Sequence, residues 1–268
     1  MVDDVYDELR KSYSTCGGKI DVIIESSGGD LDATYNLAML FRKYGNNSLN
    51  FIIPRWAKSA ATLLACAGDS IMMTPVAELG PLDPQITEMN PLEGRLEKYS
   101  PLHLNATLGL IRKEYTDGNQ MFAEGLLKRL QFPLTLGSIE KSIEIAQQYL
   151  LRLLITRMLK GNDVITKTIS EKLTTGYADH GYCINSDEAK SLGLKVYDLN
   201  ENQLNIVWDI HKLSKEKNKI ETKMKREKMA NLIKEIPPEL LNSIPSDIKN
   251  KIIPTKSPST GENNEKNK

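Results

Sequence analysis

The sequence contains few of the residues that cross-link a chain or bind metal ions. Its 268 residues include only three cysteines, Cys16, Cys66 and Cys183, and three histidines. The cysteines are odd in number, lie far apart and lack the spacing of a metal site, which excludes a disulfide framework and a cysteine-based metal centre. We therefore expect reduced thiols, as in proteins of the cytosol, and no bound metal.

Net charge, long apolar runs and nucleotide-binding motifs are absent as well. The 35 basic residues equal the acidic residues in number, a balance that gives no indication of nucleic-acid binding. No apolar run approaches the roughly 18 residues of a membrane helix and no charged-then-apolar leader opens the chain. We therefore expect a cytoplasmic protein without a transmembrane segment. The run GGDLDA lacks the G-x-G-x-x-G pattern, and no ATP-binding loop occurs, so no cofactor is expected and any unfoldase would be a separate protein.

Charge and composition change along the chain and suggest domain boundaries. Residues 201–268 carry a net charge of +4, whereas the first 200 residues carry −4. We expect one domain over 1–200, a helical extension over 201–252 and a disordered tail over 253–268. The extension holds apolar residues at near-helical spacing that suit a partner-binding segment: Ile236, Leu240, Leu241, Ile244, Ile248 and Ile252. These residues would dock on a neighbouring subunit or another protein, or fold back on their own domain.

Strands and helices alternate through the first part of the chain. The expected strands cover 20–26, 49–54 and 69–74, and the expected helices cover 4–14, 31–45 and 59–67. This order predicts an α/β fold with a parallel sheet and right-handed crossovers. Further helices are expected within 103–131, 138–160, 163–176 and 185–194, the last capped by Asn185 or Ser186.

Two features follow the ends of neighbouring strands, where ligand sites of parallel sheets lie. Gly28 and Gly29 either form a tight turn or aim their amides at a developing oxyanion. Ser59 either caps the helix that follows or is a nucleophile among small residues. One βαβ unit brings both features to the same edge of the sheet. Together they could form an oxyanion hole, from the amides of Ala60 and of Gly28 or Gly29, around a carbonyl attacked by Ser59.

Three ordered motifs add a family resemblance: IIESSGGDLDATYNLAMLFR, AKSAATLLACAGDSIMMTPVAELGPLDPQ and LTTGYADHGYCINSDEAKSLGLKV. With them, residues 4–200 resemble the serine dehydrogenase proteinase family of the Clp/crotonase superfamily, related to the Clp protease proteolytic subunit and to signal peptide peptidase A. The resemblance implies a spiral of ββα units with a parallel sheet, an oligomeric assembly and serine-dependent hydrolysis of peptide bonds in unfolded or partly folded proteins. It places Ser59 at the nucleophile, Gly28 at the oxyanion hole and Ala60 at the second amide.

The general base departs from the pattern of the Clp peptidases. Those enzymes carry a histidine on the loop after the serine and an aspartate before the last helix, whereas here Asp83 and His180 occupy these places in exchanged order. His180 is the preferred base, because neutral imidazole suits this task near pH 7, although it could instead bond a neighbouring carbonyl. Asp83 either orients the base or caps a turn. Lys98 and Lys113 are alternative bases, which would need burial to work.

Three functions remain open at this point. The first is a Clp-fold serine peptidase, the second a crotonase-like enzyme that stabilises an acyl-CoA enolate, and the third a non-catalytic scaffold of the same fold. Ser59 favours the peptidase. A homo-oligomer is expected, because apolar residues surround the helix over 149–159 more completely than one core contact requires. Lys58, beside Ser59, is expected to bind solvent or an acidic group.

Overall fold

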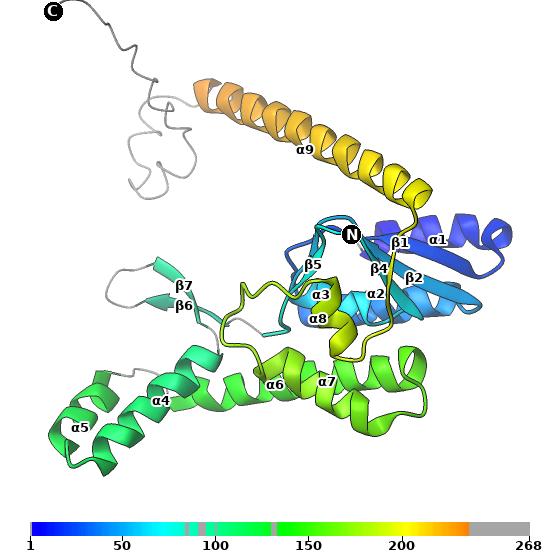
Figure 1. Cartoon of the computed structure of the whole chain (residues 1–268). Helices are drawn as coiled ribbons and strands as arrows, with labels where there is room; N and C mark the ends of the chain where they lie inside the picture. Colours follow the sequence, from blue (N-terminus) through cyan, green and yellow to red (C-terminus); the bar gives the residue numbers. More distant parts are fainter. Residues whose placement is uncertain (1, 84–85, 91–94, 100, 130–132, 236–268) are drawn as a thin grey trace, which may run out of the picture. The chain divides into compact units, whose positions relative to one another are not determined.

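The computed structural model describes residues 2–83, 86–90, 95–99, 101–129 and 133–235 (Figure 1). It divides into two compact units, Met1–Val207 and Trp208–Lys268, and each is described here by itself. The predicted boundary near residue 200 stays a prediction. The partner-binding residues proposed within 236–252 and the tail over 253–268 lie outside the described residues.

The centre of the first unit is a parallel sheet. Its strands are β1 (Lys19–Ile23), β2 (Ser48–Ile53), β4 (Ser70–Met73) and β8 (Val196–Asp198), in the order β1-β2-β4-β8. Figure 1 labels β1, β2 and β4. All three pairs of neighbouring strands are parallel. The predicted α/β fold with a parallel sheet is thereby confirmed. The three-residue strand β8 was not predicted, because so short a segment shows no periodicity.

Helices connect the strands as crossovers. The helix α2 (Leu31–Tyr44) joins β1 to β2, and it begins where the Asp30 carboxylate accepts a hydrogen bond from the Ala33 amide at 2.7 Å. The short helix α3 (Ala60–Ala65) lies between β2 and β4, and all six of its residues are buried. Its small side chains allow this close packing. Fully buried side chains of β2 and its neighbours form the core, and each stabilises the fold by about 1.5–3 kcal/mol: Leu49, Phe51, Ile53, Leu63 and Ile71.

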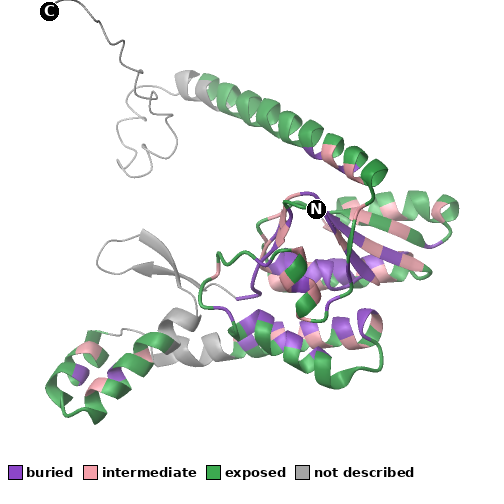
Figure 2. Ribbon diagram, in the orientation of Figure 1, coloured by how far each residue is buried: buried purple, intermediate pink, exposed green. Residues whose placement is uncertain are grey.

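The helix α6 (Pro133–Leu153) continues into a π-helical turn, η1 (Leu154–Met158), and α6 contacts α7 (Asp163–Thr175). Figure 2 shows buried residues along this part of the chain. Most of the apolar residues that suggested an oligomer are buried within the chain itself: Leu150, Leu153, Leu154, Met158 and Leu159. This helix is therefore mainly a core element of the first unit, and the oligomer needs a different argument.

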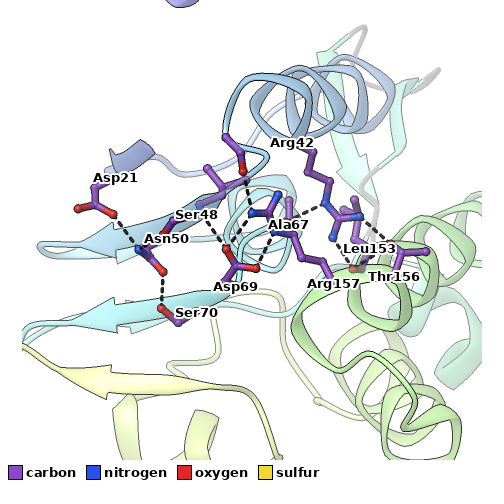
Figure 3. Close-up of polar contacts among 12 residues, drawn as sticks. Asp21, Arg42, Ser48, Asn50, Ala67, Asp69, Ser70, Leu153, Thr156 and Arg157 are labelled. Carbon is purple, nitrogen blue, oxygen red and sulfur yellow. Dashed lines mark hydrogen bonds and ion pairs between the residues drawn. The ribbon is translucent and has the colours of Figure 1, made fainter. Parts of the chain in front are cut away.

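Two arginines attach the α6–η1 helix to the sheet, and we call Arg42, Asp69 and Arg157 the arginine cluster (Figure 3). The Arg157 guanidinium donates to both carboxylate oxygens of Asp69 at 2.8 Å. The same carboxylate accepts the Leu49 amide at 2.8 Å. These bonds, those from Arg157 above all, lower the pKa of Asp69 below its usual range. Arg42 donates to the carbonyls of Ala67 and Leu153 and to the Thr156 hydroxyl.

The remaining elements of the first unit include both predicted and unpredicted ones. The helices α1 (Val2–Cys16), α4 (Pro101–Thr116) and α5 (Gln120–Arg129) lie where helices were expected. The helix α8 (Ser186–Ser191) is capped by Asn185, whose side chain accepts the Glu188 amide at 2.9 Å, so Asn185 rather than Ser186 is the cap. An antiparallel hairpin of β6 (Ile86–Asn90) and β7 (Arg95–Tyr99) was not predicted.

The helix α9 (Glu201–Glu235) runs from the end of the first unit into the second. It is largely exposed along its described length (Figure 2). Among the helices of the described residues, none is both long enough and apolar enough to cross a membrane.

Candidate active site

A second, smaller sheet places the candidate residues. Its strands β3 (Trp56–Ala57) and β5 (Glu78–Leu79) are parallel. Ser26 extends β1 and bridges Ala57 in parallel, and Ile184 bridges Leu79 in the antiparallel direction. Backbone hydrogen bonds of 2.8–3.1 Å hold these bridges, such as those between Leu79 and Ile184 in both directions. Four distant segments of the sequence therefore meet in one narrow sheet.

This arrangement brings the predicted site residues to one edge. Ser26, Ala57 and Leu79 belong to the three parallel segments of the small sheet. Gly28, Ser59 and Asp83, respectively, follow them within a few residues. His180 precedes Ile184, and the segment around Ile184 is antiparallel to Leu79. His180 therefore lies at the same edge of the small sheet. The pairing of Leu79 with Ile184 therefore places His180 at the same edge as Asp83 and Ser59, and their convergence on one reaction stays a prediction.

Ser59 has an unusual backbone conformation. Its φ of 54° and ψ of −124° make it the one non-glycine residue with positive φ among the described residues. Such a conformation costs about 1–3 kcal/mol and persists only where the surrounding structure enforces it. Ser59 occupies the N-cap position of α3, but its side chain makes no capping hydrogen bond. The interpretation of Ser59 as a helix cap is therefore wrong, and its hydroxyl is available for another role.

Gly28 lies directly against this serine. Its φ of +106° is one that side chains rarely adopt. A Cβ atom added there would lie 2.8 Å from the Lys58 carbonyl oxygen, 2.9 Å from Ser59 Cβ and 3.2 Å from the Ala60 amide nitrogen. The glycine turn thus leaves no room for a side chain between itself and the serine segment. At Gly29, by contrast, an added Cβ would meet nothing within 4 Å.

The amides around Ser59 differ in what they bind. Ala60 is the first residue of α3, so its N–H has no acceptor within the helix. The Gly28 amide donates to the Ser26 hydroxyl oxygen at 3.1 Å. A carbonyl oxygen entering the site would therefore have to compete with Ser26 for the Gly28 amide. No motif in the sequence indicates this serine–glycine hydrogen bond.

Asp83 and His180 lie together. The His180 Nδ1 atom is 3.7 Å from Asp83 Oδ2, beyond hydrogen-bonding distance but within that of an ion pair. Asp83 is completely buried, whereas 25% of the His180 side chain is exposed. The Leu82 amide, next to Asp83, is held by the Leu173 carbonyl at 2.7 Å. The aspartate is thus fixed in the core, and the imidazole lies between it and solvent.

Lys58 connects the segment of Ser59 to the segment that leads to Asp83 and to the one that follows His180. Its Nζ atom donates to the carbonyls of Tyr182 at 3.1 Å and Leu79 at 3.3 Å. The same atom lies 3.5 Å from a Glu78 carboxylate oxygen, so the expected acidic neighbour is present. Thr62 adds a second link from α3, because its hydroxyl donates to the Gly80 carbonyl at 2.8 Å. Sequence reasoning missed both linking roles, since the bonded carbonyls lie far from Lys58 and Thr62 in the sequence.

The alternative lysine bases lie elsewhere. Lys98 is in β7, paired with Thr87, and its side-chain surroundings lie outside the described residues. Lys113 is exposed on α4. It therefore lacks the burial that a lysine base requires.

Comparison with known proteins finds two similar proteins of one archaeon. Two proteins of Methanocaldococcus jannaschii, the uncharacterized proteins MJ1495 and MJ0137, are each 29% identical over 177 residues. The match covers 66% of this chain and 51% and 53% of theirs, so the chain spans about half the length of these curated relatives.

Two solved structures are similar, both mutants of the 1510-N membrane-bound stomatin-specific protease, one with a substrate peptide. Each is 17% identical, with TM-scores of 0.43 and 0.44. The matches cover 74% and 76% of this chain and 71% and 77% of those chains.

A family model described as ClpP-like SDH-type serine proteinase matches residues 2–99. This segment contains the Gly28 turn, the strained Ser59 and Asp83. Over residues 2–99 the chain is therefore similar to the ClpP-like SDH-type serine proteinases, in agreement with the resemblance seen in its motifs.

Proposed function

We propose that this protein is a serine peptidase in which Ser59 is the nucleophile, His180 the general base and Asp83 the group that orients the histidine. The amides of Ala60 and of Gly28 or Gly29 would hold the oxyanion. The substrates would be extended segments of unfolded or partly folded proteins.

The proposed reaction assigns one role to each of these groups. The Ser59 oxygen attacks the peptide carbonyl carbon while His180 accepts the hydroxyl proton. The carbonyl oxygen becomes negative and is stabilised by the backbone amides. The histidine then passes its proton to the leaving amine as the C–N bond breaks, which leaves an ester on Ser59. Water, deprotonated by His180, cleaves this ester and restores the serine.

The backbone of Ser59 is the observation that carries the proposal. A serine that serves only structure would avoid a positive φ, because a side chain there costs free energy that glycine would not. The strain is maintained at a strand-to-helix junction packed against Gly28. In this conformation the side chain makes no capping hydrogen bond, the bond that serine usually makes at the start of a helix.

The 3.7 Å separation of His180 and Asp83 leaves the carboxylate close enough to orient the imidazole. Catalytic hydrogen bonds are often long in the free enzyme and shorten when substrate binds. The partial exposure of His180 leaves room for that adjustment, while the burial of Asp83 fixes the other partner. A neutral imidazole held in this way can act as a base near pH 7.

Covalent labelling tests the proposal. The full-length protein would be incubated with a fluorophosphonate, which phosphonylates activated serines, and the adduct located by mass spectrometry of peptides. We expect one adduct, on Ser59, and none on the folded Ser59→Ala variant. A matched control is Ser27→Ala, which removes an exposed serine of the glycine turn and should leave labelling of Ser59 intact.

Activity would be measured with a fluorescently labelled unstructured protein. Ser59→Ala should abolish cleavage, and its melting temperature should show that it is folded. A folded wild-type protein that takes no label and cleaves nothing would overturn the peptidase. That result would leave a scaffold or a crotonase-like enzyme, and binding of acyl-CoA would separate those two.

A further inference from the structure

The helix α9 presents a stripe of exposed apolar side chains that the proposed peptidase does not use. Leu213 is 67% exposed and Met224 62% exposed, and Ile206, Ile210 and Ile220 are also exposed. Their spacings alternate between four and three residues, with Lys217 in the one remaining place. A repeat of seven residues of this kind is the seam of a coiled coil rather than the face of a helix in a globular core.

A second copy of α9 would cover the stripe, and the charges beside it decide the direction. In a parallel pair, Lys217 would face Lys217 of the second copy across the seam. Along the two edges, Glu216 would face Glu221 and Lys223 would face Lys228. All three contacts join like charges, so the parallel arrangement is unfavourable.

The antiparallel arrangement removes most of these conflicts. With the axis of symmetry near residue 215, Ile210 faces Ile220 of the second copy and Ile206 faces Met224. Lys217 faces Leu213, over which its long side chain can extend to reach water. Asp209 then faces Lys223 of the second copy, an opposite-charge pair that occurs twice by symmetry. The one like-charge contact is Glu216 with its own copy at the centre.

We propose that α9 is a homodimerisation element, in which two copies of this chain pair their helices antiparallel through Ile206, Ile210, Leu213, Ile220 and Met224. The pairing buries the exposed stripe and joins two peptidase units through their C-terminal helices. It does not depend on the proposed catalytic activity, because no residue of the site takes part.

Cross-linking through single cysteines tests the direction. In full-length protein with Cys16→Ser and Cys183→Ser, and with the fully buried Cys66 left in place, Ile210→Cys and Ile220→Cys would be made as separate variants. A short bismaleimide should cross-link an equimolar mixture of the two, and neither variant alone. Residues 210 and 220 are about 15 Å apart along a helix, so like positions do not meet in an antiparallel pair. A cross-link within either single variant would overturn the antiparallel pairing.

Charge substitution gives a second test with a definite sign. Lys223→Asp should weaken the dimer about tenfold, because it turns two attractions into repulsions. The double variant Asp209→Lys with Lys223→Asp should restore the affinity. A parallel dimer would instead tighten with Lys223→Asp, since the new aspartate would face Lys228. Lys215→Asp, the same change on the outer face of the helix, should leave the affinity unchanged.

The affinities would come from sedimentation equilibrium of the full-length protein over a range of concentrations. A dissociation constant insensitive to Lys223→Asp would overturn the proposal. So would a monomer at every concentration, which would mean that another part of the chain, or no protein at all, covers the stripe.

Discussion

The two ends of the parallel sheet carry polar clusters that are held in opposite ways. The arginine cluster lies at the amino ends, since Asp69 precedes β4 and bonds the backbone of Leu49 in β2. Its ion pair is short, 2.8 Å at each of two contacts (Figure 3). The candidate site lies beyond the carboxyl ends, with a strained Ser59 and a pair of 3.7 Å between His180 and Asp83.

The polar groups of the arginine cluster stabilise the fold. The polar groups of the candidate site are instead held in unfavourable arrangements by the fold. Well-formed bonds such as those of Asp69 and Arg157 lower the free energy of the native state. A serine with positive φ and a loosely paired histidine raise the free energy of the native state. Favourable contacts in the rest of the structure compensate for this cost. Substitutions in the arginine cluster should therefore change stability without changing chemistry, and substitutions in the site should do the reverse.

After the loss of the nucleophile itself, the largest effect is expected at His180. Replacing the base by alanine should lower kcat for cleavage of an unstructured protein by about 100- to 10,000-fold, the range that a general base contributes. The melting temperature should change little, because the side chain is partly exposed. Lys113→Ala is the matched control, an exposed residue whose loss should leave kcat unaltered. Equal activity of His180→Ala and the wild type would remove the histidine from the mechanism.

Gly28 should show the next largest effect. In Gly28→Ala the new methyl group would collide with the Lys58 carbonyl and with Ser59, and the positive φ would be strained. We expect a loss of kcat/KM of about 100-fold, the size reported when one oxyanion donor is removed, because the glycine turn must move away from the serine. Gly29→Ala has open space and should be nearly silent. Similar kinetics of the two variants would contradict the close approach at Gly28.

The arginine cluster should respond in stability alone. Asp69→Asn should lower the free energy of unfolding by about 1–2 kcal/mol, a modest figure because 43% of the Asp69 side chain is exposed and screened. Urea titration would measure it, and peptidase activity should be unchanged. Asp198→Asn, which breaks the exposed pair with Lys190, is the control and should cost about 0.5 kcal/mol or less.

The effect of Asp69 should depend on pH in a definite direction. Its pKa is lowered in the folded protein, mainly by Arg157, so its contribution to stability is complete above the unfolded value of about 3.9. The contribution disappears as pH falls through the lower, folded value. Wild type and Asp69→Asn should therefore differ by a constant amount from pH 5 to 8 and converge below about pH 3.9. A difference that grows in acid would contradict this linkage.

The sequence predicted those parts of the fold that repeat regularly. Apolar runs revealed β1, β2 and β4, and the helical period revealed α2 and α7, because each repeats a pattern over several residues. The proximity of Gly28 and Ser59 followed from the βαβ connection alone. The two-residue strands β3 and β5 show no periodicity, so the sequence did not predict the small sheet that positions the site residues.

The remaining features depend on contacts between distant residues. His180 reaches Asp83 because Ile184 pairs with Leu79 across more than 100 residues, a single bridge that leaves no mark on either segment. The apolar helix over 149–159 suggested an oligomer, yet it proved to be mostly core, since the sequence does not show how many neighbours surround a helix. The sign of φ at Ser59 is equally hidden, because serine is compatible with the capping conformation that was considered first.

The smallest effect, and the most direct measure of the strain, is expected from Ser59→Gly. Glycine adopts a φ of 54° without steric cost, whereas alanine keeps the strain of serine. No capping bond is lost in either variant. Ser59→Gly should therefore be more stable than Ser59→Ala by about 1 kcal/mol, the lower end of the cost of a residue in this region, less the entropy that glycine gains when unfolded. Urea titrations of the two inactive variants, compared at one temperature, would measure the difference. If Ser59→Ala proved the more stable by a similar amount, the serine would not be strained, and the contrast between the two ends of the sheet would rest on His180 and Asp83 alone.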